Sequence, residues 1–218
     1  MRWLEQLPRS KIFVVVAIAL PGLWPAWPIL RQNPTVMADP GKYLLHHFGF
    51  VACILLATVL TFTPLRVLFP TWGVAQALNR HRRLVGVSAF VYAALHLMFQ
   101  FLHEDGWPTF WKDMRKPFLL AGMGIFLILL ILAATSPNAA VRWLGGKRWK
   151  RLHRLAYVAA ALAAYHQAAA RKLFPVQVLW IFVPLGILEA ARIFRQRIQR
   201  APPVAGAARA SPPASLAS

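Results

Sequence analysis

PFLLAGMGIFLILLILAA, residues 117–134, is a run of 18 residues without a charged side chain. A helix needs about 20 largely apolar residues to span the roughly 30 Å of hydrocarbon in a bilayer. Further runs of this character lie on both sides of it, at 12–30, 44–62, 84–102, 152–170 and 173–191. The sequence therefore predicts an all-α integral membrane bundle of about six transmembrane helices.

Composition supports a membrane protein. Hydrophobic residues make up 58% of the chain and charged residues only 14%, which is more apolar surface than the core of a soluble domain of this size requires. The net charge of +19 would also suit nucleic-acid binding, but the basic residues form short clusters between the apolar runs. We therefore expect membrane lipid, and no nucleic acid, as the polyanionic partner.

The first apolar run, 12–30, follows basic residues, as the apolar part of a secretory signal also does. It is long for a signal and ends in Trp and Pro instead of a small-residue cleavage site. We interpret it as a membrane helix. Three prolines, Pro21, Pro25 and Pro28, predict a kink or fraying in its second half.

The Lys and Arg residues are distributed unequally between the two ends of the predicted bundle. Of the 25, 18 fall at the end that holds both termini, and the other seven lie in the loops at the opposite end. Because cytoplasmic loops carry the excess of positive charge, both termini are predicted to be cytoplasmic. Residues 1–200 form one predicted membrane domain, and the Ala/Pro/Ser-rich segment 201–218 is a predicted disordered cytoplasmic tail.

Motifs for catalysis in the aqueous phase are missing from the sequence. The single cysteine, Cys53, excludes a disulfide framework and a C-x-x-C-H site for covalent haem. Neither an H-E-x-x-H zinc motif nor a phosphate loop nor a nucleophile with its base can be recognised. We identify no catalytic residue, and any haem must be held non-covalently.

Three of the seven histidines lie in apolar surroundings, where an ionisable side chain is costly and marks a candidate functional site. His96 lies late in the third predicted helix, and His153 and His166 bracket the fifth. A haem iron in an electron carrier takes two axial ligands, which imidazoles from two facing helices supply. Because these helices run in the same direction, we predict that His96 and His166 hold one haem b near the periplasmic side. The alternative for His96 is a buried histidine bonded to a backbone carbonyl.

His153 precedes His166 by 13 residues, or roughly 20 Å along a helix, which suits a second haem near the cytoplasmic side. An ideal helix would turn the two side chains about 140° apart, so a non-ideal first turn after the basic residues 147–151 would have to re-aim His153. The position expected for its partner is Arg82. The second haem is therefore absent, or its other axial partner is Arg82, a water molecule or His81. Since arginine is a poor iron ligand, a salt bridge to a haem propionate is the contact we predict for Arg82, with membrane anchoring as the alternative.

The remaining histidines lie near the helix ends. His46 and His47 open the second predicted helix, and because neighbours project about 100° apart, at most one of them faces a given cofactor. Either could bond a haem propionate or line a quinol pocket, with lipid head groups as the alternative, and we take His46 as the candidate. His81 and His103 stand beside charged loop residues and are interpreted as solvated.

Several segments carry a resemblance to a known family. The most specific is GKRWKRLHRLAYVAAALAAYH, residues 146–166, with its pattern W-x-x-L-H-x-x-x-Y-x(8)-H. Over about residues 10 to 195 the chain resembles the MsrQ family, the haem-bearing membrane subunits of bacterial methionine sulfoxide reductase systems, within the ferric-reductase-like transmembrane superfamily. The other supporting segments are ADPGKYLLHHFG at 38–49, TFTPLR at 61–66 and HRRLVGVSAFVYAALH at 81–96.

The resemblance implies a b-haem subunit that carries electrons across the bacterial inner membrane. Its partner would be a periplasmic MsrP-like molybdopterin enzyme that reduces methionine sulfoxide in oxidised proteins. The family's haem ligands carry over onto His96, His153 and His166. The resemblance also implies FMN, for which the sequence yields no site, and it leaves open whether one or two haems are bound.

The electron donor is expected to be a separate molecule. Ferric reductases and NADPH oxidases of the superfamily continue into a cytosolic flavin and nicotinamide domain, whereas no G-x-G-x-x-G fingerprint follows a predicted strand here and no folded segment is expected after residue 200. Membrane quinol and a soluble flavin reductase are the candidate donors. Two alternative functions remain, a self-contained transmembrane ferric or metal reductase and a metal or proton transporter.

Overall fold

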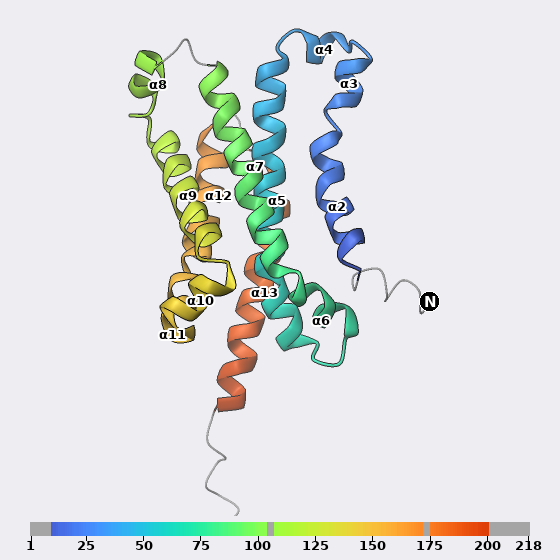
Figure 1. Ribbon diagram of the computed structural model, residues 1–218, viewed down its shortest axis with the longest axis vertical. Helices are drawn as coiled ribbons and strands as arrows, with labels where there is room; N and C mark the ends of the chain where they lie inside the picture. Colours follow the sequence, from blue (N-terminus) through green and yellow to red (C-terminus); the bar gives the residue numbers. More distant parts are fainter. Residues whose placement is uncertain (1–9, 104–106, 172–174, 201–218) are drawn as a thin grey trace, which may run out of the picture.

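Apolar helices that alternate in direction make up the protein (Figure 1). The structure is a computed structural model that describes residues 10–103, 107–171 and 175–200, and every regular element within these ranges is a helix. The predicted disordered tail, 201–218, lies outside the described residues. The helices are α2 (Lys11–Leu23), α3 (Ala26–Leu30), α4 (Pro34–Met37), α5 (Pro40–Leu68), α6 (Gly73–Arg80), α7 (Arg82–His103), α8 (Trp107–Asp113), α9 (Pro117–Ala134), α10 (Asn138–Leu144), α11 (Gly146–Leu152), α12 (Leu155–Ala169) and α13 (Val176–Arg200).

The prediction of an all-α membrane bundle is confirmed, with a difference in the number of long helices. Among the described residues, five segments are long and apolar enough to span a bilayer, and they are 11–30, 40–68, 82–103, 117–134 and 176–199. The sixth predicted crossing, 152–170, corresponds to α12, which has only 15 residues. It is shorter than predicted because the helix is interrupted at His153 and Arg154, between α11 and α12.

The first membrane segment is broken by its prolines, as predicted. The break falls between α2 and α3, next to Pro25. Because proline has no N–H, Pro25 leaves the Pro21 carbonyl without its helical donor. His47 of α5 donates to that carbonyl from Nε2 at 2.6 Å, and Tyr92 of α7 donates to the Ile18 carbonyl at 2.7 Å. These two bonds attach the kinked segment to the bundle and give His47 a structural role.

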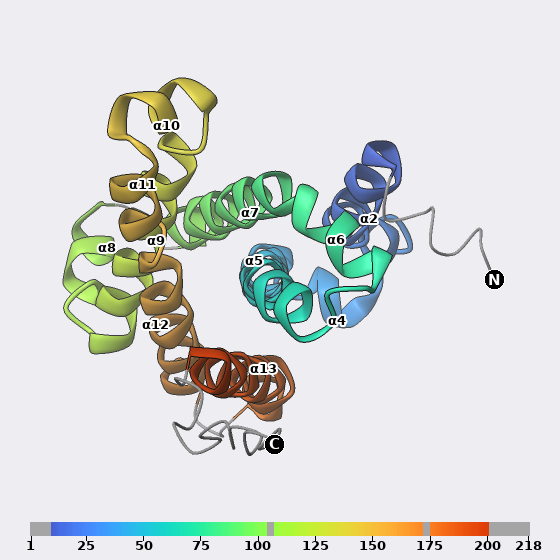
Figure 2. The ribbon, with the colours of Figure 1, turned by 90° about the horizontal axis from the view of Figure 1, so that it is seen from below.

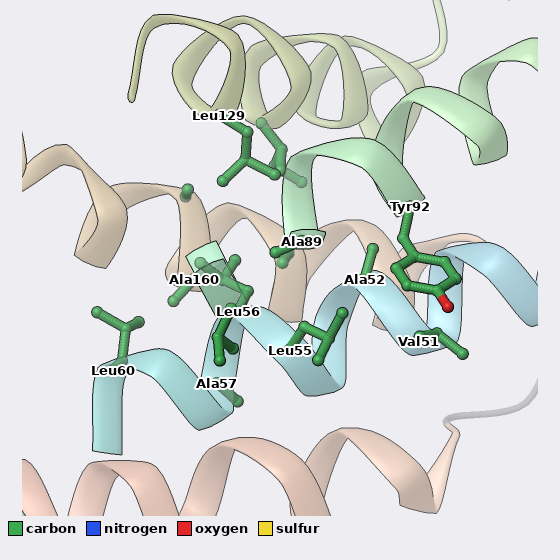
Figure 3. Packing of buried hydrophobic residues seen from close by; sticks show 14 of the residues in the cluster. Val51, Ala52, Leu55, Leu56, Ala57, Leu60, Ala89, Tyr92, Leu129 and Ala160 are labelled. Carbon is green, nitrogen blue, oxygen red and sulfur yellow. The ribbon is translucent and has the colours of Figure 1, made fainter. Parts of the chain in front are cut away.

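Helix α5 lies at the centre of the bundle (Figure 2). Of its most apolar 18 residues 44% are buried, against 11–17% in the other four long segments. It begins at Pro40, where the Asp39 carboxylate accepts a hydrogen bond from the Lys42 N–H at 2.9 Å. Around it pack α7, α12, α13 and α2, and Figure 3 shows the resulting core, in which Leu56 of α5 lies close to Ala160 of α12.

The two ends of the bundle can be told apart in Figure 1. The end that carries α3, α4 and α8 is here called the upper end, and the end that carries α6, α10 and α11 is called the lower end. Helices α2, α7 and α12 run upward, and α5, α9 and α13 run downward. The start of α2 and the end of α13 therefore point in the direction of the lower end.

Candidate functional site

His96 of α7 and His166 of α12 lie close together in the upper half of the bundle, with their ring planes nearly perpendicular. Their ring centroids are 6.0 Å apart and their ring planes are inclined by 83°. They are 70 positions apart in the sequence, and the parallel course of α7 and α12 brings them to the same depth. The structure thus brings together the two histidines that the sequence analysis paired.

Each of the two rings is held by a backbone carbonyl of a neighbouring helix. His96 Nδ1 lies 2.8 Å from the Leu45 carbonyl, and His166 Nδ1 lies 2.6 Å from the Phe118 carbonyl. A carbonyl only accepts, so the proton of each neutral ring is on Nδ1 and the lone pair is on Nε2. This is the arrangement in which metal-binding histidines are commonly oriented. The sequence analysis gave a hydrogen bond to a backbone carbonyl as the alternative to a ligand role for His96. That bond is present, and because it uses Nδ1 it is compatible with ligation through Nε2.

Two glycines make room for the imidazole rings. A Cβ atom at Gly49 would lie 2.7 Å from His96 Nδ1, and one at Gly122 would lie 2.9 Å from His166 Cε1. Real Cβ atoms do not approach so closely, so any side chain at these positions would displace a ring. Glycine allows membrane helices to approach closely, and here it lets each backbone approach the imidazole of another helix.

A cavity of about 290 Å³ opens beside the two rings and is here called the upper cavity. Its middle and lower walls are apolar, with Leu56, Ile125 and Leu129 among the residues. At its upper margin the lining becomes polar and charged. The polar and charged residues of that margin are His46, Gln100, Asp113, Lys116, Gln167 and Arg171.

The residues of the upper cavity fit a haem. Metal–imidazole bonds are about 2 Å long, and the ring centre lies about 1 Å beyond the nitrogen, so two axial imidazoles on one iron have centres about 6 Å apart. The observed separation of 6.0 Å agrees with this value. The apolar walls suit the macrocycle and the polar margin suits its carboxylates.

A second, larger cavity of about 880 Å³ occupies the lower half and is here called the lower cavity. His153 lines it and is, in the part of the chain that the structure describes, its one lining histidine. His153 is the C-terminal cap of α11 and stands at the break between α11 and α12. Its Nε2 lies 3.2 Å from Thr135 Oγ1, and its ring stacks on Trp149 with centroids 4.0 Å apart.

Arg82 also lines the lower cavity, where it approaches an aromatic ring. Its guanidinium carbon lies 5.4 Å from the centre of the Trp149 ring, within the range of a cation–π contact. Trp149 donates from Nε1 to the Thr135 carbonyl at 2.9 Å, which orients the indole that contacts both His153 and Arg82. His81 is the C-terminal cap of α6 and does not contribute to the described lining of this cavity.

Positive charge is concentrated around the lower cavity, which Arg82, Arg83, Lys150, Arg154 and Arg192 all line. A carboxylate pairs with one of these cations. Glu189 accepts from Arg192 at 2.6 Å and from the Tyr157 hydroxyl at 3.0 Å.

The two cavities adjoin in the middle of the bundle. Leu56 of α5 and Leu129 of α9 line both of them. Figure 3 shows these two side chains in the same buried cluster as Ala89 and Ala160. A thin apolar wall is therefore the boundary between the upper and lower cavities.

The other predicted site residues lie nearer the surface. His46 is exposed and stands at the margin of the upper cavity, in agreement with a position at a cofactor's edge. His103 Nδ1 lies 3.8 Å from the Asp39 carboxylate. The ligand roles of His96, His153 and His166 and the propionate roles of Arg82 and His46 stay predictions.

Comparison with known proteins identifies the family. A family described as ferric reductase like transmembrane component matches residues 48–164. The haem-binding subunit MsrQ of protein-methionine-sulfoxide reductase from Rhodospirillum rubrum is 36% identical over 201 residues, which cover 88% of this chain and 93% of that protein. The chain belongs to the MsrQ family.

Other relatives differ in how much of their length is shared. MsrQ from Pectobacterium carotovorum is 34% identical over 190 residues, covering 85% of this chain and 92% of that protein. Magnetosome protein MamZ from Magnetospirillum gryphiswaldense is 34% identical over 165 residues, covering 72% of this chain but only 24% of MamZ. No solved structure matches this chain significantly.

Sequence reasoning missed several residues of the site. Gly49 and Gly122 were not singled out, although a glycine inside a membrane helix is a recognised signal of close approach. Trp149 was noted only as part of a pattern. Its hydrogen bond to the Thr135 carbonyl depends on the fold, whereas its stacking on His153, four residues later, is a local contact. The sequence around Gln167 did not indicate a site residue, because the cavity that Gln167 lines is formed together with other helices.

Proposed function

We propose that this protein is a b-haem electron-transfer subunit of a methionine sulfoxide reductase system. The observation that carries the proposal is the facing pair His96 and His166, whose Nδ1 atoms are bonded to carbonyls and whose separation suits two axial ligands. The printed names of the MsrQ relatives, which describe haem-binding subunits, support the same cofactor.

When bound, haem supplies a one-electron redox centre. The chain's own residues prepare its site. The carbonyls of Leu45 and Phe118 keep the proton on Nδ1 of each imidazole, so that the lone pair of Nε2 would hold the iron. Gly49 and Gly122 allow the rings to take up this position, and the apolar walls exclude water from the macrocycle.

We propose in addition that the lower cavity takes a second haem, with His153 as one ligand. Supporting this are the volume of the cavity, its apolar boundary with the upper cavity and its five cationic side chains, which suit carboxylates. Arg82 is the proposed partner of a propionate there. The apolar wall formed by Leu56 and Leu129 would then separate two redox centres by a short distance.

The proposed location is the bacterial inner membrane, with the lower end and both termini in the cytoplasm. The support is the distribution of basic residues, 18 of which belong to the predicted cytoplasmic side. Electrons would enter from membrane quinol or a cytosolic flavin reductase and leave for a periplasmic MsrP-like molybdopterin reductase. In this way the protein would support repair of oxidised periplasmic proteins. FMN stays an expectation from the family, without residues assigned to it.

Visible spectroscopy of the detergent-purified protein tests the proposal. A sharp reduced α-band and a haem-to-protein ratio of one or two are expected for bis-imidazole haem. Rapid mixing of the reduced protein with an oxidised MsrP-like partner should then return the spectrum to the ferric form. A protein without haem would contradict the cofactor, and a stable reduced spectrum in the presence of the partner would contradict the electron path.

A second candidate function is direct reduction of ferric ion or another external acceptor, which the match to the ferric-reductase-like family favours. Oxidation of the reduced haem by a ferric chelate, without any partner protein, would support it. The transporter hypothesis predicts purified protein without haem, so the same spectrum tests it.

A further inference from the structure

The upper cavity changes in polarity from one margin to the other. Leu56, Ile125 and Leu129 line its lower part. Charged and polar side chains from α5, α7, α8 and α12, from the α8–α9 connection and from the residues after α12 line its upper margin. A haem has one edge with two carboxylates and is otherwise apolar. Burying a carboxylate against the lower part would be costly, so the carboxylate edge of a haem in this cavity must face the upper margin.

Two cations stand at that margin. Lys116 precedes α9 and Arg171 follows α12, so the two basic side chains approach the cavity from different helices. Lys116 Nζ lies 2.6 Å from the Asp113 carboxylate, which positions it. Arg171 makes no salt bridge to a described residue. Its planar guanidinium can bind a carboxylate through two parallel hydrogen bonds.

A buried amide completes the margin. Gln167 belongs to α12 and lies four residues before Arg171, which follows that helix. Its Oε1 atom is buried without a hydrogen-bond partner among the described residues. An unpaired buried polar atom is costly and indicates an absent partner. Because the two ends of an amide can exchange by rotation, Gln167 can present its NH₂ group to a carboxylate at the same position.

We infer that Arg171 is the residue that anchors the carboxylates of the upper haem, assisted by Lys116 and Gln167. The inference rests on the proposed function, and it adds the orientation of the haem, with both carboxylates at the upper margin. A carboxylate that is ion-paired with Arg171 places less negative charge near the iron, so this contact also raises the reduction potential of the upper haem. Arg171 is thus a positioning residue for the cofactor and sets its potential.

The experiment measures binding of haem and of its dimethyl ester, whose carboxylates cannot form ion pairs. Both are titrated into the full-length protein after haem extraction, for wild type, Arg171→Gln, Arg171→Lys and Lys116→Gln. Arg115→Gln is the matched control. Arg115 lies beside Lys116 in the α8–α9 connection but does not line the upper cavity. Repeating the titrations with His153→Ala removes any contribution of the lower cavity.

Wild type is expected to bind haem roughly tenfold or more tightly than the ester, because a hydrogen bond to a charged group contributes about 1.5–3 kcal/mol. In Arg171→Gln this preference should fall severalfold and the potential of the loaded protein should decrease. Lys116→Gln should show the same changes to a smaller extent, and Arg171→Lys should restore part of both. Arg115→Gln should match wild type.

Two outcomes separate the inference from the function on which it rests. If haem binds with a spectrum that depends on His96 and His166, but Arg171→Gln keeps the wild-type preference and potential, the anchoring inference is wrong and the proposed function stands. If the protein takes up no haem at the histidine pair, both are overturned.

Discussion

The upper and lower cavities share walls from four helices, α5, α7, α9 and α12, yet they differ in ligands, charge and size, and residues of α10, α11 and α13 line only the lower one. The upper cavity is smaller and presents two facing imidazoles, each fixed by a carbonyl. The lower cavity is about three times larger, with one lining histidine and five cationic side chains from the described chain. The difference teaches that one bundle can offer a site defined by ligand geometry at one end and a site defined mainly by charge at the other.

The largest effect is expected in a test of which end of the bundle faces the cytoplasm, because the reporter should be either active or inactive. Fusing a reporter that is active only in the periplasm to the C-terminus should give no activity, because the basic lower end is predicted to be cytoplasmic. The same reporter inserted into the connection near residue 105, between α7 and α8, should be active. An active C-terminal fusion would invert the direction of electron flow between the cavities.

Removing an imidazole from the upper cavity should abolish its haem. His96→Ala and His166→Ala each take away one of two axial ligands, so the low-spin α-band of this haem should disappear. His103→Ala is the control, since His103 is at the surface near Asp39. Wild-type haem content and spectrum in both variants would refute the ligand assignment.

A smaller effect is expected in the lower cavity. His153→Ala should remove about half of the haem and leave the spectrum of the upper haem unchanged, if both cavities are occupied. Arg82→Ala should keep the haem number but alter the spectrum or occupancy of the lower haem, since Arg82 is the proposed propionate partner. A wild-type protein that saturates at one haem, together with an unchanged His153→Ala variant, would reduce His153 to a structural residue at the helix break.

The smallest effect is expected when the close packing of Gly122 against His166 in the upper cavity is disturbed. In Gly122→Ala the new Cβ would lie 2.9 Å from His166 Cε1, so the ring must move away from the Phe118 carbonyl. We expect haem affinity to fall by about tenfold, which corresponds to about 1.4 kcal/mol. Gly124→Ala on the same helix is the matched control, because its Cβ would lie at an ordinary 3.7 Å from Leu162. Equal haem affinity in the two variants would show that the packing against His166 does not matter for binding.

Much of the fold followed from local patterns. Long uncharged segments such as 117–134 predicted membrane helices, and prolines near residue 25 predicted the break in the first of them. The depth of His96 and His166 followed from their late positions in two helices of the same direction. Such features depend only on residue type and helical rise, which is why the sequence was sufficient.

The shortening of the fifth predicted crossing was only partly foreseeable. The 13-residue spacing of His153 and His166 indicated that an unbroken helix could not aim both side chains at one partner. It did not show that the chain leaves the helix at His153 and resumes it at Leu155. That break accompanies the packing of His153 on Trp149, one helical turn earlier, and the contact of His153 with Thr135, which follows α9.

The sequence by itself determined that this protein is an all-α membrane bundle with apolar histidines suited to haem. Only the tertiary structure decided that the Leu45 and Phe118 carbonyls orient the two imidazoles, that Gly49 and Gly122 admit them, and that Arg171 and Lys116 meet at one margin. The physical reason is that apolarity and helical period are local properties of the chain. The partners of a side chain are set by the packing of helices distant in sequence, and no local pattern encodes that packing.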